Sequence, residues 1–72
     1  MKNVLLITEQ EKDDQVLRNK LEKIAFNHDG NLIGLRINEN KKIIYLFDFV
    51  NTKKFEKFKM EKLIQNFKIT EE

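Results

Sequence analysis

The chain has 72 residues, no cysteine or serine, a single histidine (His28) and a net charge of +2. This composition leaves room for one domain, residues 1–72, and supplies neither disulfides nor enough ligands for a structural metal site. It also excludes the usual nucleophile and triad schemes of enzymes. A chain this short buries only about 60% of the surface that it exposes when unfolded, so we expect a domain of marginal stability or one completed by a partner.

The first apolar segment, Val4–Thr8 (VLLIT), is apolar at successive positions, which predicts a short strand covered on both faces. Its apolar run is too short for a signal peptide and far too short to span a bilayer. We therefore expect a cytoplasmic protein that does not enter a membrane.

A helix is predicted next, and its start has two possible caps. Thr8 could cap it, with Glu11 three residues on, or Asp13 could, with Asp14 in the first turn. The apolar positions at helical spacing are Leu17, Leu21, Ile24 and Ala25. The helix is expected to end within residues 27–31 (NHDGN), where Gly30 or Asn27 can adopt the left-handed conformation.

Residues 32–37 (LIGLRI) and 41–50 (KKIIYLFDFV) flank a turn-like segment, which predicts a β-hairpin. Loop length decides which side chains share a face, because a shift of one residue moves the whole set to the other face. A loop of two or four residues would bury Asp48 among aliphatic side chains, so we favour three or five residues, with Asn40 left-handed. One face then carries Ile33, Leu35, Ile37, Ile43, Tyr45, Phe47 and Phe49. The other carries Leu32, Gly34, Arg36, Ile44, Leu46 and Asp48.

A second helix is predicted after Asn51 or Thr52, either of which can cap it. Its apolar stripe is expected to be Met60, Leu63, Ile64 and Phe67. Phe55 and Phe58 lie off this stripe, so either the helix begins near residue 57 or the two rings face away from the core. The two rings can then either seal the bottom of the core at the junction of strand and helix or contact a partner. Residues 69–72 are expected to form a frayed end.

The predicted order of elements is β-α-β-β-α, an α+β fold. A right-handed crossover makes the first two strands parallel, and the third strand, which is the longest and most apolar, fits between them in the order 1-3-2. Both helices then cover one face of a three-stranded sheet, in a ferredoxin-like arrangement that lacks its last strand. The second face is left uncovered and keeps the apolar residues Leu32, Ile44, Leu46 and Val50.

The only cluster with possible metal chemistry is a group of four acidic residues: Glu9, Glu11, Asp13 and Asp14. Carboxylates of this kind can hold Mg²⁺, but the same residues are expected to cap and solubilise the first helix. No glycine-rich phosphate loop is present. We therefore expect no enzymatic activity, no catalytic residues, no metal and no cofactor.

Nucleic-acid binding is the alternative function. Tyr45, Phe47 and Phe49 alternate along a strand beside Lys42, as aromatic residues do in the base-stacking strands of RNA-recognition modules, although the glycines of that motif are absent. The pattern favours a core position for these rings, which would leave lysines to make salt-sensitive phosphate contacts. The candidate lysines are Lys42, Lys53, Lys54, Lys57, Lys59 and Lys62.

The favoured hypothesis is a protein-interaction module: a homodimer, a regulatory subunit, or a compact inhibitor made by a virus or mobile element. Lys, Asn, Ile, Glu and Phe are abundant, and their AT-rich codons indicate a low-GC genome or a virus or plasmid living in one. An uncovered apolar sheet face and exposed rings on the second helix would form the contact. The candidate interface residues are Leu32, Ile44, Leu46, Val50, Phe55 and Phe58.

Overall fold

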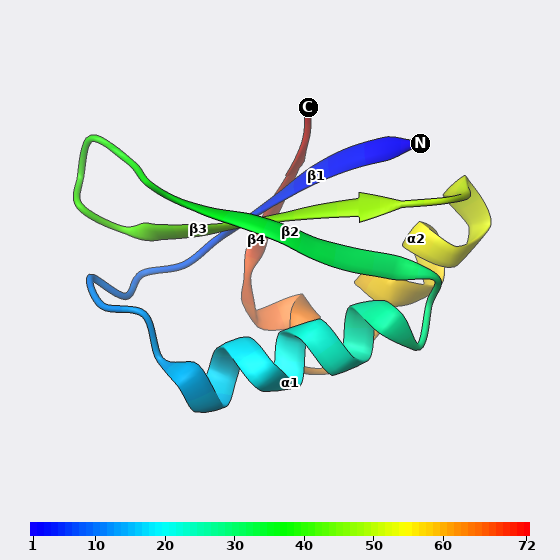
Figure 1. Cartoon of the computed structure of the whole chain (residues 1–72), viewed down its shortest axis with the longest axis horizontal. Coiled ribbons are helices and arrows are strands. Elements are labelled where there is room, and N and C mark those ends of the chain that lie inside the picture. The colour runs from blue at the N-terminus through cyan, green and yellow to red at the C-terminus, as the bar shows by residue number, and fades with distance from the viewer.

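The computed structural model of the protein describes all residues from Met1 to Glu72 and shows an α+β fold with two helices and a four-stranded antiparallel sheet (Figure 1). In chain order the elements are β1 (Lys2–Ile7), α1 (Gln15–Phe26), β2 (Gly30–Ile37), β3 (Ile43–Phe49), α2 (Thr52–Lys59), a short 3₁₀ helix η1 (Ile64–Asn66) and β4 (Lys68–Glu71). The strands lie in the order β2-β3-β1-β4. Neither helix has the length and apolar character needed to cross a membrane.

The carboxyl-terminal residues form a strand, which corrects the prediction of a three-stranded sheet with a frayed end at residues 69–72. β4 pairs antiparallel with β1, with Ile69 opposite Leu6, and Ile69 packs against the core. β3 lies between β1 and β2 as predicted. The order β-α-β-β-α-β is that of the complete ferredoxin-like arrangement, not of a version that lacks its last strand.

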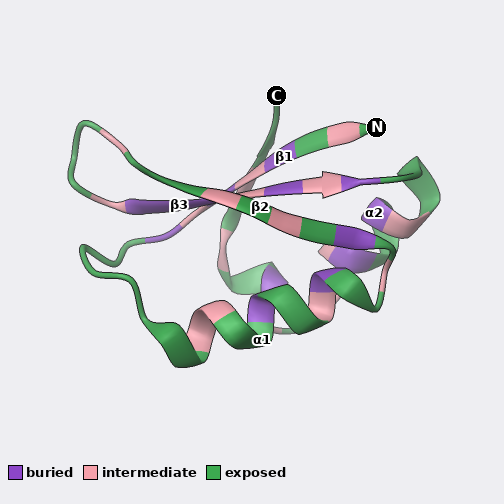
Figure 2. Cartoon of the chain, viewed as in Figure 1, coloured by how far each residue is buried: buried purple, intermediate pink, exposed green.

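Both helices pack on the same face of the sheet and enclose one core (Figure 2). The buried cluster consists of Val4, Leu6, Leu21, Ala25, Ile43, Tyr45, Phe47, Phe49, Phe55, Phe58 and Ile64. The predicted core position of the β3 rings is confirmed, because Tyr45, Phe47 and Phe49 are fully buried. The predicted stripe of α1 is also confirmed: Leu21 and Ala25 are buried, and Leu17 and Ile24 pack against the cluster.

The ends of α1 differ in detail from the prediction. Asp14 caps the helix, and its carboxylate accepts hydrogen bonds from the backbone N–H of Val16 and Leu17 at 3.0 and 3.3 Å. Thr8 is instead buried at the end of β1, where its hydroxyl donates to the carbonyl of Ile43 at 2.8 Å. After the helix, the left-handed residue is Asp29, with φ 59°.

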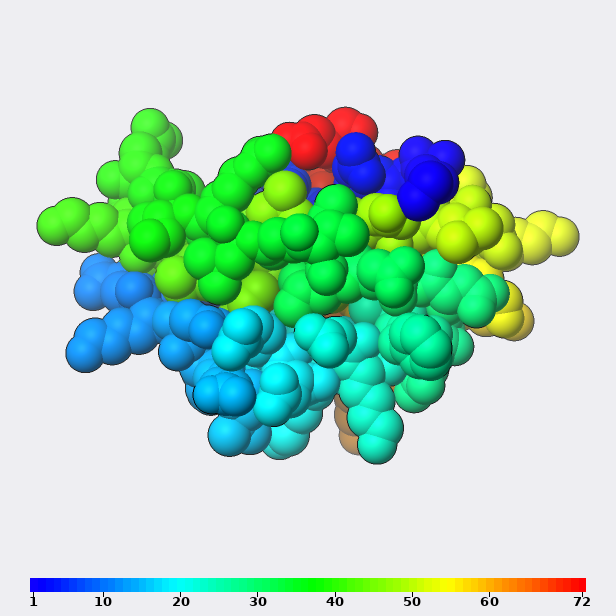
Figure 3. All heavy atoms as spheres, viewed as in Figure 1, coloured from blue at the N-terminus to red at the C-terminus, as the bar shows by residue number.

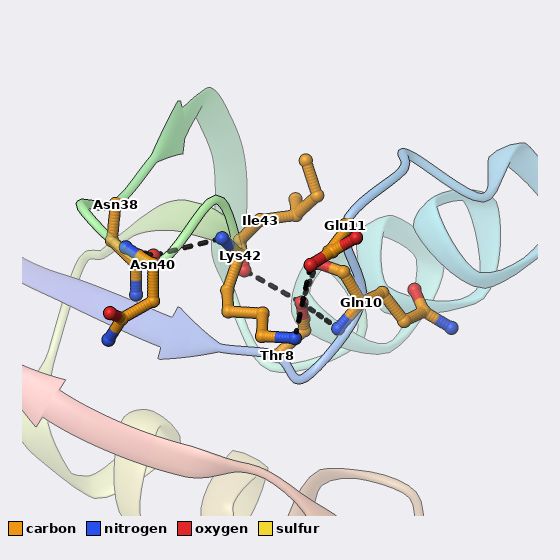
Figure 4. Close-up of polar contacts among 7 residues, drawn as sticks. All are labelled: Thr8, Gln10, Glu11, Asn38, Asn40, Lys42 and Ile43. Carbon is orange, nitrogen blue, oxygen red and sulfur yellow. Dashed lines mark hydrogen bonds and ion pairs between the residues drawn. The ribbon is translucent and has the colours of Figure 1, made fainter.

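The hairpin loop, residues 38–42, has the odd length that was predicted, since Ile37 pairs with Ile43. Its left-handed residue is Lys41, with φ 64°, rather than Asn40. The side chain of Asn38 closes the loop, because its Oδ1 accepts hydrogen bonds from the N–H groups of Asn40 and Lys42, both at 2.9 Å (Figure 4).

A β-bulge in β2 changes the predicted assignment of side chains to faces. Leu32 pairs with Phe47 and Gly34 with Leu46, so Ile33 is an extra residue in the ladder. An extra residue reverses the alternation of faces from that point. Leu32 therefore points to the helices, whereas Ile33, predicted for the core, lies on the opposite face.

α2 is shorter than predicted and presents a different side to the core. Its cap is Asn51, one of the two predicted candidates, and the side chain accepts from the N–H of Lys54 at 2.8 Å. Since the helix ends at Lys59, its inward residues are Phe55 and Phe58, three positions apart and fully buried. Met60, predicted to lie on the apolar stripe, is 72% exposed.

Candidate functional site

The two edges of the sheet differ in length and chemistry. β4 has four residues and carries Lys68 and Glu71, and Glu71 forms an ion pair with Lys2. β2 has eight residues, and its Ile33, Leu35 and Ile37 are 54%, 42% and 65% exposed. An edge strand also presents backbone N–H and C=O groups that no neighbouring strand satisfies, and natural proteins usually protect such an edge with short length and charge. β4 has this protection, and most of β2 does not.

The side of α1 next to β2 is mixed, because polar and charged side chains separate the exposed apolar residues near its two ends. A surface hollow of about 440 Å³ lies between the two elements. Its lining residues are Asn19, Glu22, Lys23, Phe26, Gly30, Asn31 and Leu32. Phe26 is 71% exposed, and Val16, which lies on the same side of the helix by its spacing from Asn19 and Lys23, is 64% exposed.

We call the surface formed by β2 and this side of α1 the β2 flank. Its exposed residues are Val16, Asn19, Glu22, Lys23, Phe26, Asn31, Ile33, Leu35, Arg36 and Ile37. In Figure 3 the β2 flank faces the viewer, with the green atoms of β2 above the cyan atoms of α1. The only charged residue of β2 is Arg36, whose Nη1 lies 3.0 Å from Oε2 of Glu72. The flank therefore combines exposed apolar side chains with polar and charged ones.

The uncovered sheet face, which was predicted to make the contact, is less exposed than expected. Ile44 is only 9% exposed and Leu46 is partly buried. Arg36 and Glu72 meet on this face and line a small hollow together with Ile33 and Leu46. Of the interface residues predicted on the sheet, Val50 alone is widely exposed, at 62%, and Leu32 packs toward the helices.

The predicted exposure of Phe55 and Phe58 is wrong. The ring of Phe58 lies 4.7 Å from Phe49 and 5.4 Å from Phe47, measured between centroids. Phe55 contacts Phe49 in the same way at 5.4 Å, and the ammonium of Lys59 lies over its ring at 4.8 Å. Both rings are core residues and are not available to a partner.

The acidic group after β1 is used for structure. Asp14 caps α1, and Asp13 accepts a hydrogen bond from the hydroxyl of Tyr45 at 2.8 Å. Burial raises the pKa of Tyr45 to about 12, and the bond to Asp13 acts in the same direction. Glu11 lies 3.7 Å from Lys42 (Figure 4). No group of three or more His, Cys, Asp or Glu side chains is placed so that it could hold a metal ion.

The candidate lysines do not surround an exposed aromatic surface. Lys42 is paired with Glu11, and Lys59 lies 3.0 Å from Glu56. The others, Lys53, Lys54, Lys57 and Lys62, lie on or just after α2. Because the neighbouring rings of β3 and α2 are buried, these rings offer no platform on which bases could stack.

Comparison of the chain with protein-family models, with curated proteins and with solved structures gives no match. The geometry of the chain itself therefore carries the functional argument. Sequence reasoning missed the β2 flank because it assigned Ile33, Leu35 and Ile37 to the core. One signal was present: Gly34 interrupts an apolar strand, and an isolated glycine in a strand often marks a bulge.

Proposed function

We propose that the protein is a small interaction module that acts by binding another protein chain through its β2 flank, and not by catalysis. The observation that carries this proposal is the difference between the two sheet edges: β4 is short and charged, whereas β2 is long and exposes Ile33, Leu35 and Ile37. Selection against unwanted edge pairing would act on both edges. An edge left apolar is accounted for if a partner covers it.

The chemistry of the flank indicates how a partner would bind. Unpaired backbone groups of β2 can form a ladder with an added strand, while exposed side chains supply apolar contact on either side of it. A regulatory subunit or a compact inhibitor made by a virus or mobile element would use this surface in the same way. The proposal thus moves the contact from the predicted sheet face and second helix to β2 and α1.

Site-specific photo-crosslinking in cells of the native host tests this proposal. A photoreactive residue is placed at Leu35 on the β2 flank, and the matched control carries it at Thr70 on the opposite edge. We expect protein adducts, with a second copy or with a different chain, from position 35 and few from position 70. Equal labelling from both positions, or none from position 35, would contradict the proposal.

A further inference from the structure

We infer that the partner of the β2 flank is a second copy of this chain, whose β2 pairs antiparallel with the first about a two-fold axis between Ile33 and Gly34. This inference rests on the proposed function, because it uses the same surface. It adds the identity of the partner and the register of the pairing.

The bulge gives β2 a palindromic pattern of faces. The residues on the helix side, identified by their pairing with β3 residues of the core cluster, are Gly30, Leu32, Leu35 and Ile37. The residues on the outer side are Asn31, Ile33, Gly34 and Arg36. Read in either direction, the strand runs helix side, outer, helix side, outer, outer, helix side, outer, helix side. When two copies of such a strand pair antiparallel, each residue can lie opposite a residue of the other copy that points to the same side of the sheet, along the whole length of the strand.

Only one register achieves this match. With the axis between Ile33 and Gly34, every helix-side residue lies opposite a helix-side residue of the second copy. A shift of one residue places helix-side residues opposite outer ones, because side chains alternate along a strand. A shift of two residues breaks the match at the centre. A bulge can protect an edge from pairing, but at the middle of β2 it makes the strand self-complementary.

The side chains brought together in this register are complementary. Each glycine of one copy lies opposite an isoleucine of the other, Gly30 opposite Ile37 and Gly34 opposite Ile33. Leu32 faces Leu35 on the helix side. These pairs place small residues opposite large ones and apolar residues opposite apolar ones, as favourable cross-strand pairs do.

The charges of the paired strands are also compatible. Arg36, the only charged residue of β2, lies opposite Asn31 of the second copy. No two like charges therefore face each other, an arrangement that would be unfavourable.

The pairing also explains why Phe26 and Ile37, the two most exposed apolar residues of the β2 flank, are exposed in the single chain. Ile37 of the second copy lies opposite Gly30 on the helix side, where Phe26, Gly30 and Leu32 line the hollow of about 440 Å³. Phe26 is 71% and Ile37 65% exposed in the single chain. In the dimer Ile37 of each copy enters the hollow of the other and covers Phe26.

A stable dimer requires that α1 take part in the interface together with β2. Stable interfaces bury about 1,200–2,000 Å² in total, which is more than a single strand pair supplies. Eight residues of β2 span about 26 Å. The exposed side of α1 that belongs to the β2 flank lies beside them. Pairing of β2 would produce one continuous eight-stranded sheet, with the two copies of α1 side by side on the same face.

Disulfide cross-linking tests the register, because the chain has no native cysteine. Asn31→Cys and Arg36→Cys place thiols on opposing residues, whose Cα atoms are about 4.5–5.5 Å apart in an antiparallel pair and within disulfide reach. In a dimer of two copies of the same variant, the two thiols are about 17 Å apart along the strand. We expect a disulfide dimer from the mixture of the two variants and little from each alone. No dimer from the mixture, or equal yields from all three samples, would overturn the register.

Sedimentation equilibrium of the purified chain tests whether the partner is a second copy of the same chain. We expect a wild-type dimer, and a dissociation constant raised about tenfold or more by Leu35→Lys and by Ile37→Lys, both at exposed positions. Met60→Lys is the matched control, because it makes the same kind of change at an exposed residue outside the flank, and it should leave the dimer intact. A monomeric wild type would overturn this inference without removing the proposed function, which adducts between position 35 and a different protein would still support. A dimer that withstands both β2 substitutions would overturn it as well.

Discussion

At the scale of single residues, the ring of Phe58 is central to the core. It lies between Phe47 and Phe49, with centroid distances of 5.4 and 4.7 Å. Truncation of a buried phenylalanine costs about 3–5 kcal/mol, a large part of the roughly 5–15 kcal/mol that stabilises a domain. We predict that Phe58→Ala lowers the free energy of unfolding by about this amount in urea titrations. Met60→Ala, at a 72% exposed position, is the control and should have little effect; the reverse order of effects would contradict the assigned core.

The stability of the folded state at high pH depends on the protonation of Tyr45. Its pKa is raised from the ordinary value of 10.0 to about 12, mainly by burial and secondly by the hydrogen bond to Asp13. The neutral hydroxyl is thus favoured in the folded state, so its contribution to stability is complete below pH 10 and is lost as the pH rises toward 12. We predict a steeper loss of stability across this range for the wild type than for Tyr45→Phe. Since Tyr45 is the only tyrosine, absorbance of its phenolate reports the titration directly, and a midpoint near 10 in the folded protein would refute the assignment.

At the scale of elements, the two glycines of β2 have different roles. A Cβ atom added to Gly30 would lie 2.3 Å from Cε1 of Phe49, whereas at Gly34 the nearest atom is 3.9 Å away. Overpacking of a core usually costs about 1–3 kcal/mol. We predict that Gly30→Ala destabilises the single chain by at least this amount, and that Gly34→Ala is nearly neutral when both are compared by thermal denaturation in the monomeric Leu35→Lys background. Equal effects would show that the ring of Phe49 does not occupy the space beside Gly30.

The elements with strong local signals could be predicted from the sequence. Helical spacing located α1, alternation located the β2–β3 hairpin with its odd loop, and Asn51 marked the start of α2. β4 was missed because its four residues include one apolar side chain, Ile69, and its stability comes from pairing with β1. The faces of β2 were misassigned because a bulge depends on pairing geometry that period-two alternation does not contain.

The candidate site was harder to predict than the fold, because it depends on the bulge in β2 and on the point at which α2 ends. Leu32 was assigned to the surface and Ile33 to the core, and the bulge exchanged them. Phe55 and Phe58 were judged against a helix that was expected to continue past residue 60. Once α2 ends at Lys59, its two rings become the inward side and the exposed apolar surface lies elsewhere.

At the scale of the whole molecule, the helices cover one face of the sheet and leave β2 as a long apolar edge. The net charge of +2 is small, and several lysines are paired with glutamates, so the exposed apolar residues of β2 and α1 distinguish the surface more than its charge does. A second copy would cover these residues and extend the sheet across the axis. We therefore expect the outward backbone groups of β2 to be hydrogen-bonded in solution, although the single chain leaves them unpaired.

Hydrogen–deuterium exchange of the purified protein over a series of concentrations measures this directly. We predict that amides of β2 that point away from β3 become protected as the concentration rises. We also predict that Leu35→Lys abolishes this protection and that the outward amides of β4 exchange rapidly throughout. If the outward amides of β2 exchange as fast as those of β4 at every concentration, while β3 stays protected, β2 is a free edge and the proposed strand pairing is refuted.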